Sequence, residues 1–379
     1  MTHKMLPPLL YKGSVKNVRG KVSDDFLIFE YSDRYSIFDW GEMPDQIADK
    51  GKALNLMGAA FFKLVGDKKT WSELFKSPAL KHFDQQYLST LQTSSVYQNF
   101  CQKGLTHHFK AVVNDECSEV KNIKVVRPEK KANVYNYEKY QDRLVNTLVP
   151  LEVIFRLGLA PGNSLSKRFK AQPHLMTQFG LDSIPAEGTL LNRPCVDFST
   201  KLENGDRYLT YAEAQRISGM SSDEFLKLRA TTELISLCLY AFHAEMDLEL
   251  WDGKVEFAFV QGEDLSRDFM LVDSIGIDEL RLISESRSLS KEFLREVYKN
   301  TPWHIALSEA KKEAITVQKD FREICKNKYN QSPEPLSAEN KEKAQSLYKS
   351  YCNSVYQLLH VSLPFENRYT VKNYLRTYL

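Results

Sequence analysis

The chain has 379 residues, of which 42% are hydrophobic and 12% are aromatic, as is typical of a globular protein with two or three domains. Its formal net charge of +2 gives no strong field, so neither nucleic acid nor an anionic membrane is an expected partner. The cysteines are scattered without zinc-site spacing, which is typical of reduced thiols in a cytoplasmic protein. Because the sequence has no long apolar run, we expect no signal peptide and no membrane span.

The first strands are predicted between residues 9 and 31, as a hairpin. Residues 9–18 and 26–31 are rich in apolar, aromatic and branched side chains, and the polar residues 19–25 form the turn between them. Gly13 lies inside the first strand, which it weakens unless another group must approach closely. A nucleotide phosphate above Gly13, with Lys16 beside it, would explain this glycine, and so would a simple β-bulge.

The next segments are polar or helical. A polar loop at residues 32–39 precedes a segment whose apolar residues from Leu54 to Val65 recur at helical spacing. Residues 66–103 are expected to form an inserted helical segment, and residues 128–147 a charged insertion or linker. His107 and His108 would indicate a metal site only if further ligands converge on them.

A short apolar strand is predicted at residues 150–156. Glu152 and Arg156 share one face of it, and an apolar core does not accept two unpaired charges. They either pair with each other or bind a ligand. The small-residue loop at residues 162–168 carries two cations and would suit an anion, although exposed loop lysines are common. A long helix then begins at Ser221, which forms a capping box with Glu224.

The strongest chemical signal lies at residues 251–273, which are predicted to form two strands joined by a polar loop. Alternation places Val255, Phe257 and Phe259 on one face, and it places an acid, a base and an acid on the other face, namely Asp252, Lys254 and Glu256. Asp273 ends the next strand and would bring a further carboxylate near Glu256. Two carboxylates and a lysine suit Mg²⁺ bound to a nucleotide phosphate. The alternative is a solvated strand face with a surface ion pair.

Residues 303–326 and 337–360 are predicted to be amphipathic helices, separated by a proline-containing segment. Strands and helices are mixed along the chain and hairpins occur, so the predicted fold class is α+β. We expect two domains. Residues 1–149 form a β-rich nucleotide-binding domain with a helical insertion, and residues 150–379 form an α+β domain that ends in helices.

Several motifs, taken in this order, resemble the SAICAR synthetase family, the phosphoribosylaminoimidazole-succinocarboxamide synthases of purine biosynthesis. The matching segments are Tyr11–Lys16, Ser32–Asp39 with Lys50–Gly51, Pro150–Arg156, Ser164–Arg168, Ser199–Glu203, Asp252–Phe257, Asp273–Arg281 and Ser288–Arg295. The sixth segment fits the family's Asp-x-Lys-x-Glu-Phe strand, and the fifth fits its Ser-Thr-Lys-x-Glu pattern. Because the motifs keep their register over nearly 300 residues, chance similarity is a poor explanation.

The resemblance implies a small N-terminal β domain, a larger ATP-grasp-like α+β domain and C-terminal helices. It implies an ADP-forming, ATP-dependent amide ligase that activates a ribonucleotide carboxylate as an acyl phosphate and condenses it with L-aspartate. The implied cofactors are ATP and Mg²⁺. Homo-oligomers are common in the family, so a homo-oligomer is a further expectation.

The resemblance also implies roles for individual residues. The residues implied in catalysis are Asp252, Lys254 and Glu256, of which Glu256 would hold Mg²⁺ together with Asp273. The residues implied in ATP binding are Gly13, Ser14, Lys16, Glu152, Glu256 and Asp273. The residues implied in substrate binding are Arg34, Ser36, Arg156, Ser164, Lys201, Arg281, Lys291 and Arg295.

The sequence departs from the family pattern at several positions. Ser14 stands where the family usually has a phosphate-binding lysine, Ser274 replaces an acid, and Ser290 replaces an aspartate. The metal and acyl-activation set is retained better than the substrate-holding loops. Two alternatives therefore remain beside SAICAR synthesis: a ligase of the same family that joins a different acid and amine, and a nucleotide-binding relative that has lost catalysis.

Overall fold

The structure is a computed structural model that describes residues 6–378 except 133, 161–162, 264–265 and 286. The chain divides into two compact units. The first comprises residues 1–57, 111–120 and 287–379, and the second comprises residues 58–110 and 121–286. The predicted domain boundary after residue 149 stays a prediction.

The first unit is built around a five-stranded sheet in the order β1-β2-β3-β5-β4, in which β2 pairs antiparallel with β1 and with β3. Its strands are β1 (Leu9–Lys12), β2 (Lys16–Arg19), β3 (Phe26–Tyr31), β4 (Phe109–Asn114) and β5 (Cys117–Lys121). The prediction of one strand over residues 9–18 is wrong, because the chain turns between β1 and β2. Gly13 lies in that turn, where its N–H donates to the Lys16 carbonyl at 2.9 Å. A Cβ atom on Gly13 would lie 2.6 Å from that oxygen, so the close approach requires glycine.

Helices form the C-terminal part of the first unit. They are α9 (Glu292–Tyr298), α10 (Pro302–Val317), α11 (Phe321–Asn327), α12 (Ala338–Leu358) and α13 (Val371–Tyr378), and the short strand β14 (Arg287–Ser288) precedes them. The helix predicted over residues 303–326 is interrupted. Gln318 takes a left-handed conformation with φ of 54°, and Asp320 caps the next helix by accepting from the Arg322 N–H. The helix predicted over residues 337–360 is confirmed as α12.

The second unit contains the larger sheet, in the order β10-β9-β11-β13, with β8 and β12 also paired to β11. The strands are β8 (Thr147–Leu148), β9 (Leu151–Gly158), β10 (Leu190–Thr200), β11 (Glu249–Gln261), β12 (Arg267–Val272) and β13 (Leu280–Ser284). β11 is central because its first half pairs with β9 and β13, and its second half pairs with β12. The predicted pair of strands at residues 251–273 is therefore confirmed as β11 and β12.

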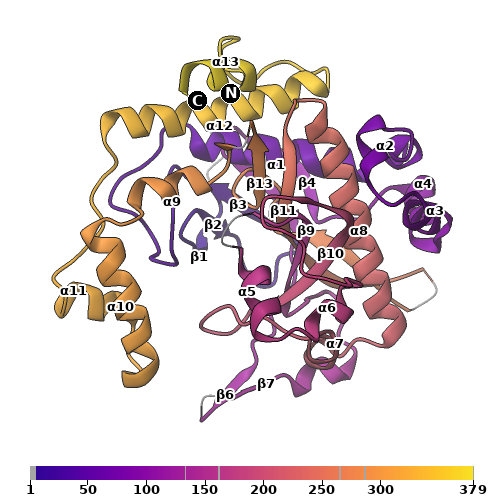
Figure 1. Ribbon diagram of the computed structural model, residues 1–379, viewed down its shortest axis with the longest axis horizontal. Helices are drawn as coiled ribbons and strands as arrows, with labels where there is room; N and C mark the ends of the chain where they lie inside the picture. The colour runs from indigo at the N-terminus through magenta and orange to yellow at the C-terminus, as the bar shows by residue number, and fades with distance from the viewer. Residues whose placement is uncertain (1–5, 133, 161–162, 264–265, 286, 379) are drawn as a thin grey trace. The chain divides into compact units, whose positions relative to one another are not determined.

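Helix α8 (Ser222–Ala244) runs alongside β9, β10 and β11 (Figure 1). Ser221 and Glu224 form the predicted capping box, and almost the whole C-terminal half of the helix is buried. The other helices of the unit are α2 (Lys68–Leu74), α3 (Gln85–Thr93), α4 (Ser95–Lys103), α5 (Ser164–Ala171), α6 (Leu175–Gln178) and α7 (Tyr211–Ser218), with 3₁₀ turns η1 (Pro78–His82) and η2 (Glu138–Asp142). The predicted inserted helical segment is confirmed, since α2, η1, α3 and α4 occupy it. Between Lys121 and β8 lies the β6–β7 hairpin (Glu129–Lys131 and Val134–Asn136).

Helix α1 (Lys50–Gly66) belongs to both units, because the division of the chain falls at residue 57. Of the helices in the described ranges, none combines the length and the apolar character that crossing a membrane requires.

Candidate active site

A row of alternating charges lies on one face of β11 in the second unit. Val255, Phe257 and Phe259 are buried on the opposite face, as the strand pattern predicted. Glu256 is only 5% exposed, so this row is not the solvated strand face of the alternative interpretation. A buried carboxylate needs charged or hydrogen-bonding partners, and the neighbouring strands supply them.

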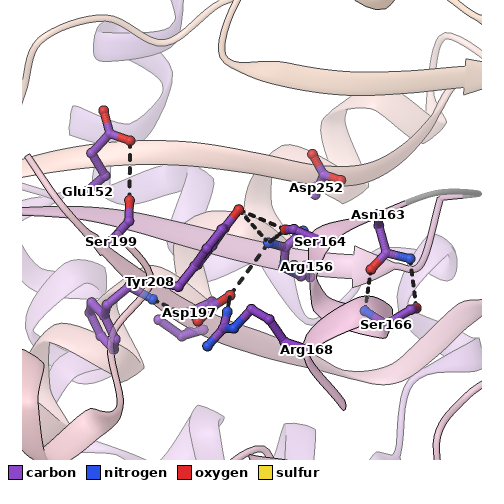
Figure 2. A network of polar contacts seen from close by, with 12 residues as sticks. Glu152, Arg156, Asn163, Ser164, Ser166, Arg168, Asp197, Ser199, Tyr208 and Asp252 are labelled. Atoms are coloured by element: carbon purple, nitrogen blue, oxygen red, sulfur yellow. Dashed lines mark hydrogen bonds and ion pairs between the residues drawn. The ribbon is translucent and has the colours of Figure 1, made fainter. Parts of the chain in front are cut away.

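The partners come from β9 and from the end of β10. Lys254 Nζ lies 2.7 Å from Glu152 Oε1 of β9. Lys201, which directly follows β10, places its Nζ 2.5 Å from Glu256 Oε1 and 3.4 Å from Glu152 Oε1. Two lysines and two glutamates thus alternate in one cluster, in which the glutamates are buried and the lysines are half-buried. Ser199 adds a hydroxyl that donates to Glu152 Oε2 at 3.4 Å (Figure 2).

Burial and neighbouring charges both shift the pKa values of the residues in this cluster. Burial would raise the pKa of Glu152, but Lys254 and Lys201 outweigh it and hold that pKa below its usual value. Burial raises the pKa of Glu256, and the nearby carboxylate of Asp273 raises it further. Burial would lower the pKa of Lys201, but Glu256, Asp273 and Glu152 outweigh it and raise that pKa. The Glu256–Asp273 side of the cluster therefore carries an excess of negative charge, whereas Glu152 is well compensated.

Asp273 directly follows β12 and has a left-handed backbone with φ of 68°. Outside glycine this conformation is uncommon and is concentrated at functional sites. The Asp273 carbonyl lies 3.0 Å from Nε2 of the buried His108, which helps to hold the bend. The rings of His107 and His108 both pack against the Phe62 ring. Within the described residues, no group of three or more His, Cys, Asp or Glu side chains is arranged to hold a metal.

A second polar network surrounds Arg156 on β9 (Figure 2). Arg156 Nη2 donates to Ser164 Oγ at 3.1 Å and lies 3.5 Å from Asp197 Oδ2. Arg168 reaches the same Asp197 oxygen at 2.6 Å, and its guanidinium lies over the Tyr208 ring at 4.4 Å. The Ser164 hydroxyl donates to the Tyr208 hydroxyl at 2.7 Å. Two arginines therefore converge on one fully buried carboxylate.

Arg156 also faces Asp252 across the β9–β11 pairing, and Arg281 faces Asp252 from β13. Arg281 Nη1 lies 3.0 Å from Asp252 Oδ2. Burial would lower the pKa of Arg156, but Asp252 and Asp197 outweigh it and raise that pKa. Arg156 is only 5% exposed, and its buried Nε has no hydrogen-bond partner among the described residues. A buried donor of this kind is costly unless a ligand oxygen accepts from it.

The structure settles one alternative that the sequence left open. Glu152 and Arg156 do not pair with each other, because four residues along a strand separate them by about 13 Å. Glu152 pairs with the lysines, and Arg156 joins the Asp197 network.

The prediction of a loop over residues 162–168 is wrong for residues 164–168, which are helical. Asn163 caps α5, which begins at Ser164. Residue 162 lies outside the described residues.

Sequence reasoning missed Asp197, Tyr208 and Ser199 as members of the site. Asp197 and Ser199 lie on β10 within a run of buried residues, so no local alternation of polar and apolar side chains marks them. The local signal for Asp197 was an aspartate between the apolar residues Val196 and Phe198, because a buried acid requires a cation. Tyr208 lies outside any helix or strand and carries no sequence signal that we can identify.

The first unit holds the remaining predicted residues, namely Gly13, Ser14, Lys16, Arg34, Ser36, Lys291 and Arg295. Arg34 is buried and donates to the Gly13 carbonyl at 3.1 Å and to Asn17 Oδ1 at 2.7 Å. Lys16 Nζ lies 4.4 Å from the centre of the Phe29 ring.

The other members of this set lie at element ends or in loops. Ser14 is exposed in the β1–β2 turn, and Ser36 is half-buried in the loop after β3. Lys291 occupies the N-cap position of α9. Arg295 pairs with Glu292 within that helix at 2.8 Å. Arg295, for which the resemblance implied substrate binding, thus forms an ion pair at the surface of this unit.

Comparison with known proteins agrees with the motifs. The SAICAR synthetase family profile matches residues 9–310. The chain is 34% identical over 329 residues to a protein of Archaeoglobus fulgidus that is provisionally assigned as a phosphoribosylaminoimidazole-succinocarboxamide synthase, covering 86% of this chain and 87% of the relative. It is 27% identical over 315 residues to the phosphoribosylaminoimidazole-succinocarboxamide synthase of Thermoplasma acidophilum, covering 81% and 88%.

Solved structures agree on the fold. The SAICAR synthase of Saccharomyces cerevisiae in complex with SAICAR aligns with a TM-score of 0.56 at 17% identity, covering 96% of this chain and 98% of that one. The synthase of Ehrlichia chaffeensis aligns with a TM-score of 0.51 at 19% identity, covering 86% and 100%. The predicted α+β SAICAR synthetase-like fold is confirmed. The extent of the family match and the archaeal identity lead to one conclusion: this chain is a member of the SAICAR synthetase family.

Proposed function

We propose that this protein is an ADP-forming ligase that joins the carboxylate of carboxyaminoimidazole ribonucleotide to the amine of L-aspartate, as its family name and its relatives' names indicate. The observation that carries the proposal is the charged cluster in which Lys254 and Lys201 pair with the buried Glu152 and Glu256 beside Asp273. Such a cluster costs stability unless it serves a charged ligand, because burial of ions is unfavourable.

The reaction has two balanced steps. A carboxylate oxygen of the substrate attacks the γ-phosphorus of ATP, and the bond from phosphorus to the ADP oxygen breaks, which gives an acyl phosphate and ADP. The neutral amine of aspartate then attacks the acyl carbon, the bond to the phosphate oxygen breaks, and the nitrogen loses a proton. Most of the catalysis in such a transfer comes from positioning and charge neutralisation.

Lys254 and Lys201 are the groups that neutralise charge in this proposal. Glu152 holds Lys254 at 2.7 Å, and Glu256 holds Lys201 at 2.5 Å, so both ammonium groups are fixed before a ligand arrives. Charges that are fixed in advance lower the cost of reorganisation when phosphate oxygens gain charge. Asp252 keeps Arg281 in place, at 3.0 Å.

The carboxylates of Glu256 and Asp273 fit a divalent cation. Burial and then the repulsion from Asp273 raise the pKa of Glu256, and carboxylate oxygens are the ligands that Mg²⁺ prefers. When bound, Mg²⁺ would supply charge neutralisation at the nucleotide phosphates. With two protein carboxylates the remaining ligands would be phosphate oxygens and water, as is usual for Mg²⁺.

Arg156, Ser164 and Arg281 are proposed to hold the phosphate of the ribonucleotide. Arginine suits phosphate because its donors form a planar fork, and Arg156 Nε is a buried donor without a partner in the part of the chain that the structure describes. In the first unit, Gly13, Ser14 and Lys16 are proposed to contact ATP, and Arg34, Ser36, Lys291 and Arg295 to contact substrate. A cytoplasmic location and a homo-oligomeric state remain predictions.

The experiment measures ADP release by the purified protein with Mg-ATP, carboxyaminoimidazole ribonucleotide and L-aspartate, each omitted in turn, together with the product mass. ADP and a succinocarboxamide product that require all three substrates would support the proposal. ATP binding without turnover of this pair would refute it in favour of another acid or amine. Such a result would agree with the departures at Ser14, Ser274 and Ser290.

A further inference from the structure

Tyrosine hydroxyls in the first unit connect the loop after β3 with the segment between α11 and α12. The Tyr35 hydroxyl donates to Asp45 Oδ1 at 2.7 Å and lies 2.9 Å from the Tyr298 hydroxyl. The Tyr298 hydroxyl in turn contacts the Glu334 carbonyl at 2.7 Å. Tyr35 is fully buried and Tyr298 is 5% exposed, so water does not compete for these contacts.

The Tyr298 hydroxyl takes part in two of these contacts, one with the Tyr35 hydroxyl and one with the Glu334 carbonyl. Burial raises the pKa of both tyrosines, that of Tyr298 to about 12, so each hydroxyl keeps one proton at neutral pH. The Tyr35 proton goes to the Asp45 carboxylate, which can only accept when ionised. The Tyr298 proton is then available to Tyr35 or to the Glu334 carbonyl. Removing the Tyr298 hydroxyl therefore breaks both contacts at once.

Asp45 strengthens the same connection. Its Oδ2 accepts from the Leu336 N–H at 3.0 Å and lies 3.1 Å from Lys341 Nζ. The side chain of Asp45 is 9% exposed. Charge-assisted hydrogen bonds to a nearly buried carboxylate are stronger than neutral ones. The segment 334–341 is thus fastened to the loop through a carboxylate as well as through Tyr298.

The loop after β3 also contacts the β1–β2 turn, through Arg34. The Tyr35 carbonyl accepts from the Met43 N–H at 3.1 Å, which closes the loop on itself. The neighbouring Arg34 donates to the Gly13 carbonyl and to Asn17. Fixing Tyr35 therefore restricts Arg34, and through Arg34 it restricts the turn that contains Gly13.

We propose that Tyr35, Tyr298 and Asp45 are positioning residues, through which segment 334–341 holds the β1–β2 turn in its ATP-binding geometry. This segment lies beyond residue 310, where the family match ends, whereas Tyr35, Asp45 and Tyr298 lie within the matched range. The inference rests on the proposed function, in which the turn contacts ATP.

The test compares Tyr298→Phe with the matched control Tyr356→Phe. Both variants keep the ring and lose a hydroxyl that donates to a backbone carbonyl, and the Tyr356 hydroxyl reaches Leu56 in α1 at 3.2 Å. Since a lost hydrogen bond costs a free energy equivalent to a severalfold change in an equilibrium constant, we expect Tyr298→Phe to raise the Kd and the KM of ATP about 3- to 10-fold, with kcat within about twofold. The control should leave all three constants unchanged.

Hydrogen exchange of the amides in residues 13–17 and 33–39 supplies a readout that needs no turnover. Tyr298→Phe should speed their exchange, and Tyr356→Phe should not, even where both variants lower the melting temperature equally. Equal ATP affinity and equal exchange in the two variants would overturn this inference. Absent turnover of the proposed substrates by the wild-type protein would refute the proposed function instead, since ATP affinity and exchange can still be compared.

Discussion

Replacement of Glu152 on β9 by glutamine tests whether its ion pair with Lys254 of β11 serves catalysis. Glutamine keeps the size of the side chain and can still accept a hydrogen bond, but it removes the charge that holds Lys254 and Lys201. Lys201 keeps its contact with Glu256, whereas Lys254 loses its closest carboxylate. The substitution therefore acts mainly on Lys254.

The expected loss of stability follows from geometry and exposure. Two unit charges 2.7 Å apart attract by about 6 kcal/mol at an effective dielectric constant of 20, which is an upper limit. Removing one partner of a buried pair costs about 3–5 kcal/mol. The Lys254 side chain is 39% exposed, and water then compensates part of its charge. We expect the free energy of unfolding to fall by about 2–3 kcal/mol, and kcat to fall about 100-fold as one fixed charge is lost.

The control is Glu224→Gln, which removes another nearly buried glutamate of the second unit. Glu224 pairs with Arg267 at 2.8 Å and with Arg143 at 2.9 Å, and it lies in the capping box of α8. Chemical denaturation of both variants would measure stability, and ADP release would measure activity. Both variants should be destabilised, but only Glu152→Gln should lose most of its kcat.

Two results would refute this reasoning. If Glu152→Gln retained wild-type kcat while losing stability, the cluster would be structural only. If Glu224→Gln lost kcat to the same degree, the loss in Glu152→Gln would reflect general destabilisation and would say nothing about Lys254.

Three further predictions concern other carboxylates. Glu256→Ala should abolish metal-dependent ADP release while circular dichroism shows an intact fold; normal ATP turnover would show that the metal assignment is wrong. Asp197→Asn should raise the KM of the ribonucleotide about tenfold in steady-state assays, because Arg156 and Arg168 lose their shared carboxylate, and an unchanged KM would contradict this role. The pKa of Glu224 is lowered to about 2 from 4.5 despite burial, because Arg267 and the Ser221 N–H favour the charged form. Its contribution to stability is therefore present above pH 4.5 and is lost as the pH falls toward 2, so the melting temperature should fall less steeply over this range in Glu224→Gln.

Much of the site could be predicted because its signals are local. The alternation along β11 assigned Asp252, Lys254 and Glu256 to one face, since successive side chains of a strand point to opposite faces. The capping box of α8 was visible for the same reason, because its members are three residues apart. Gly13 was recognised as special, but local patterns did not distinguish the approach of a nucleotide phosphate from a β-bulge there. In the structure, the group that approaches Gly13 closely is the Lys16 carbonyl.

The partners of each charge were decided only by the tertiary structure. Glu152 and Lys254 are 102 residues apart in the chain, and they meet because β9 and β11 pair in one particular register. Asp197 joins Arg156 and Arg168 through the pairing of β9 with β10 and the placement of α5. The sequence by itself determined the residue types, their faces and the family. Strand register and packing, which depend on contacts between distant segments, decided which charges neutralise one another and which donor is left for a ligand.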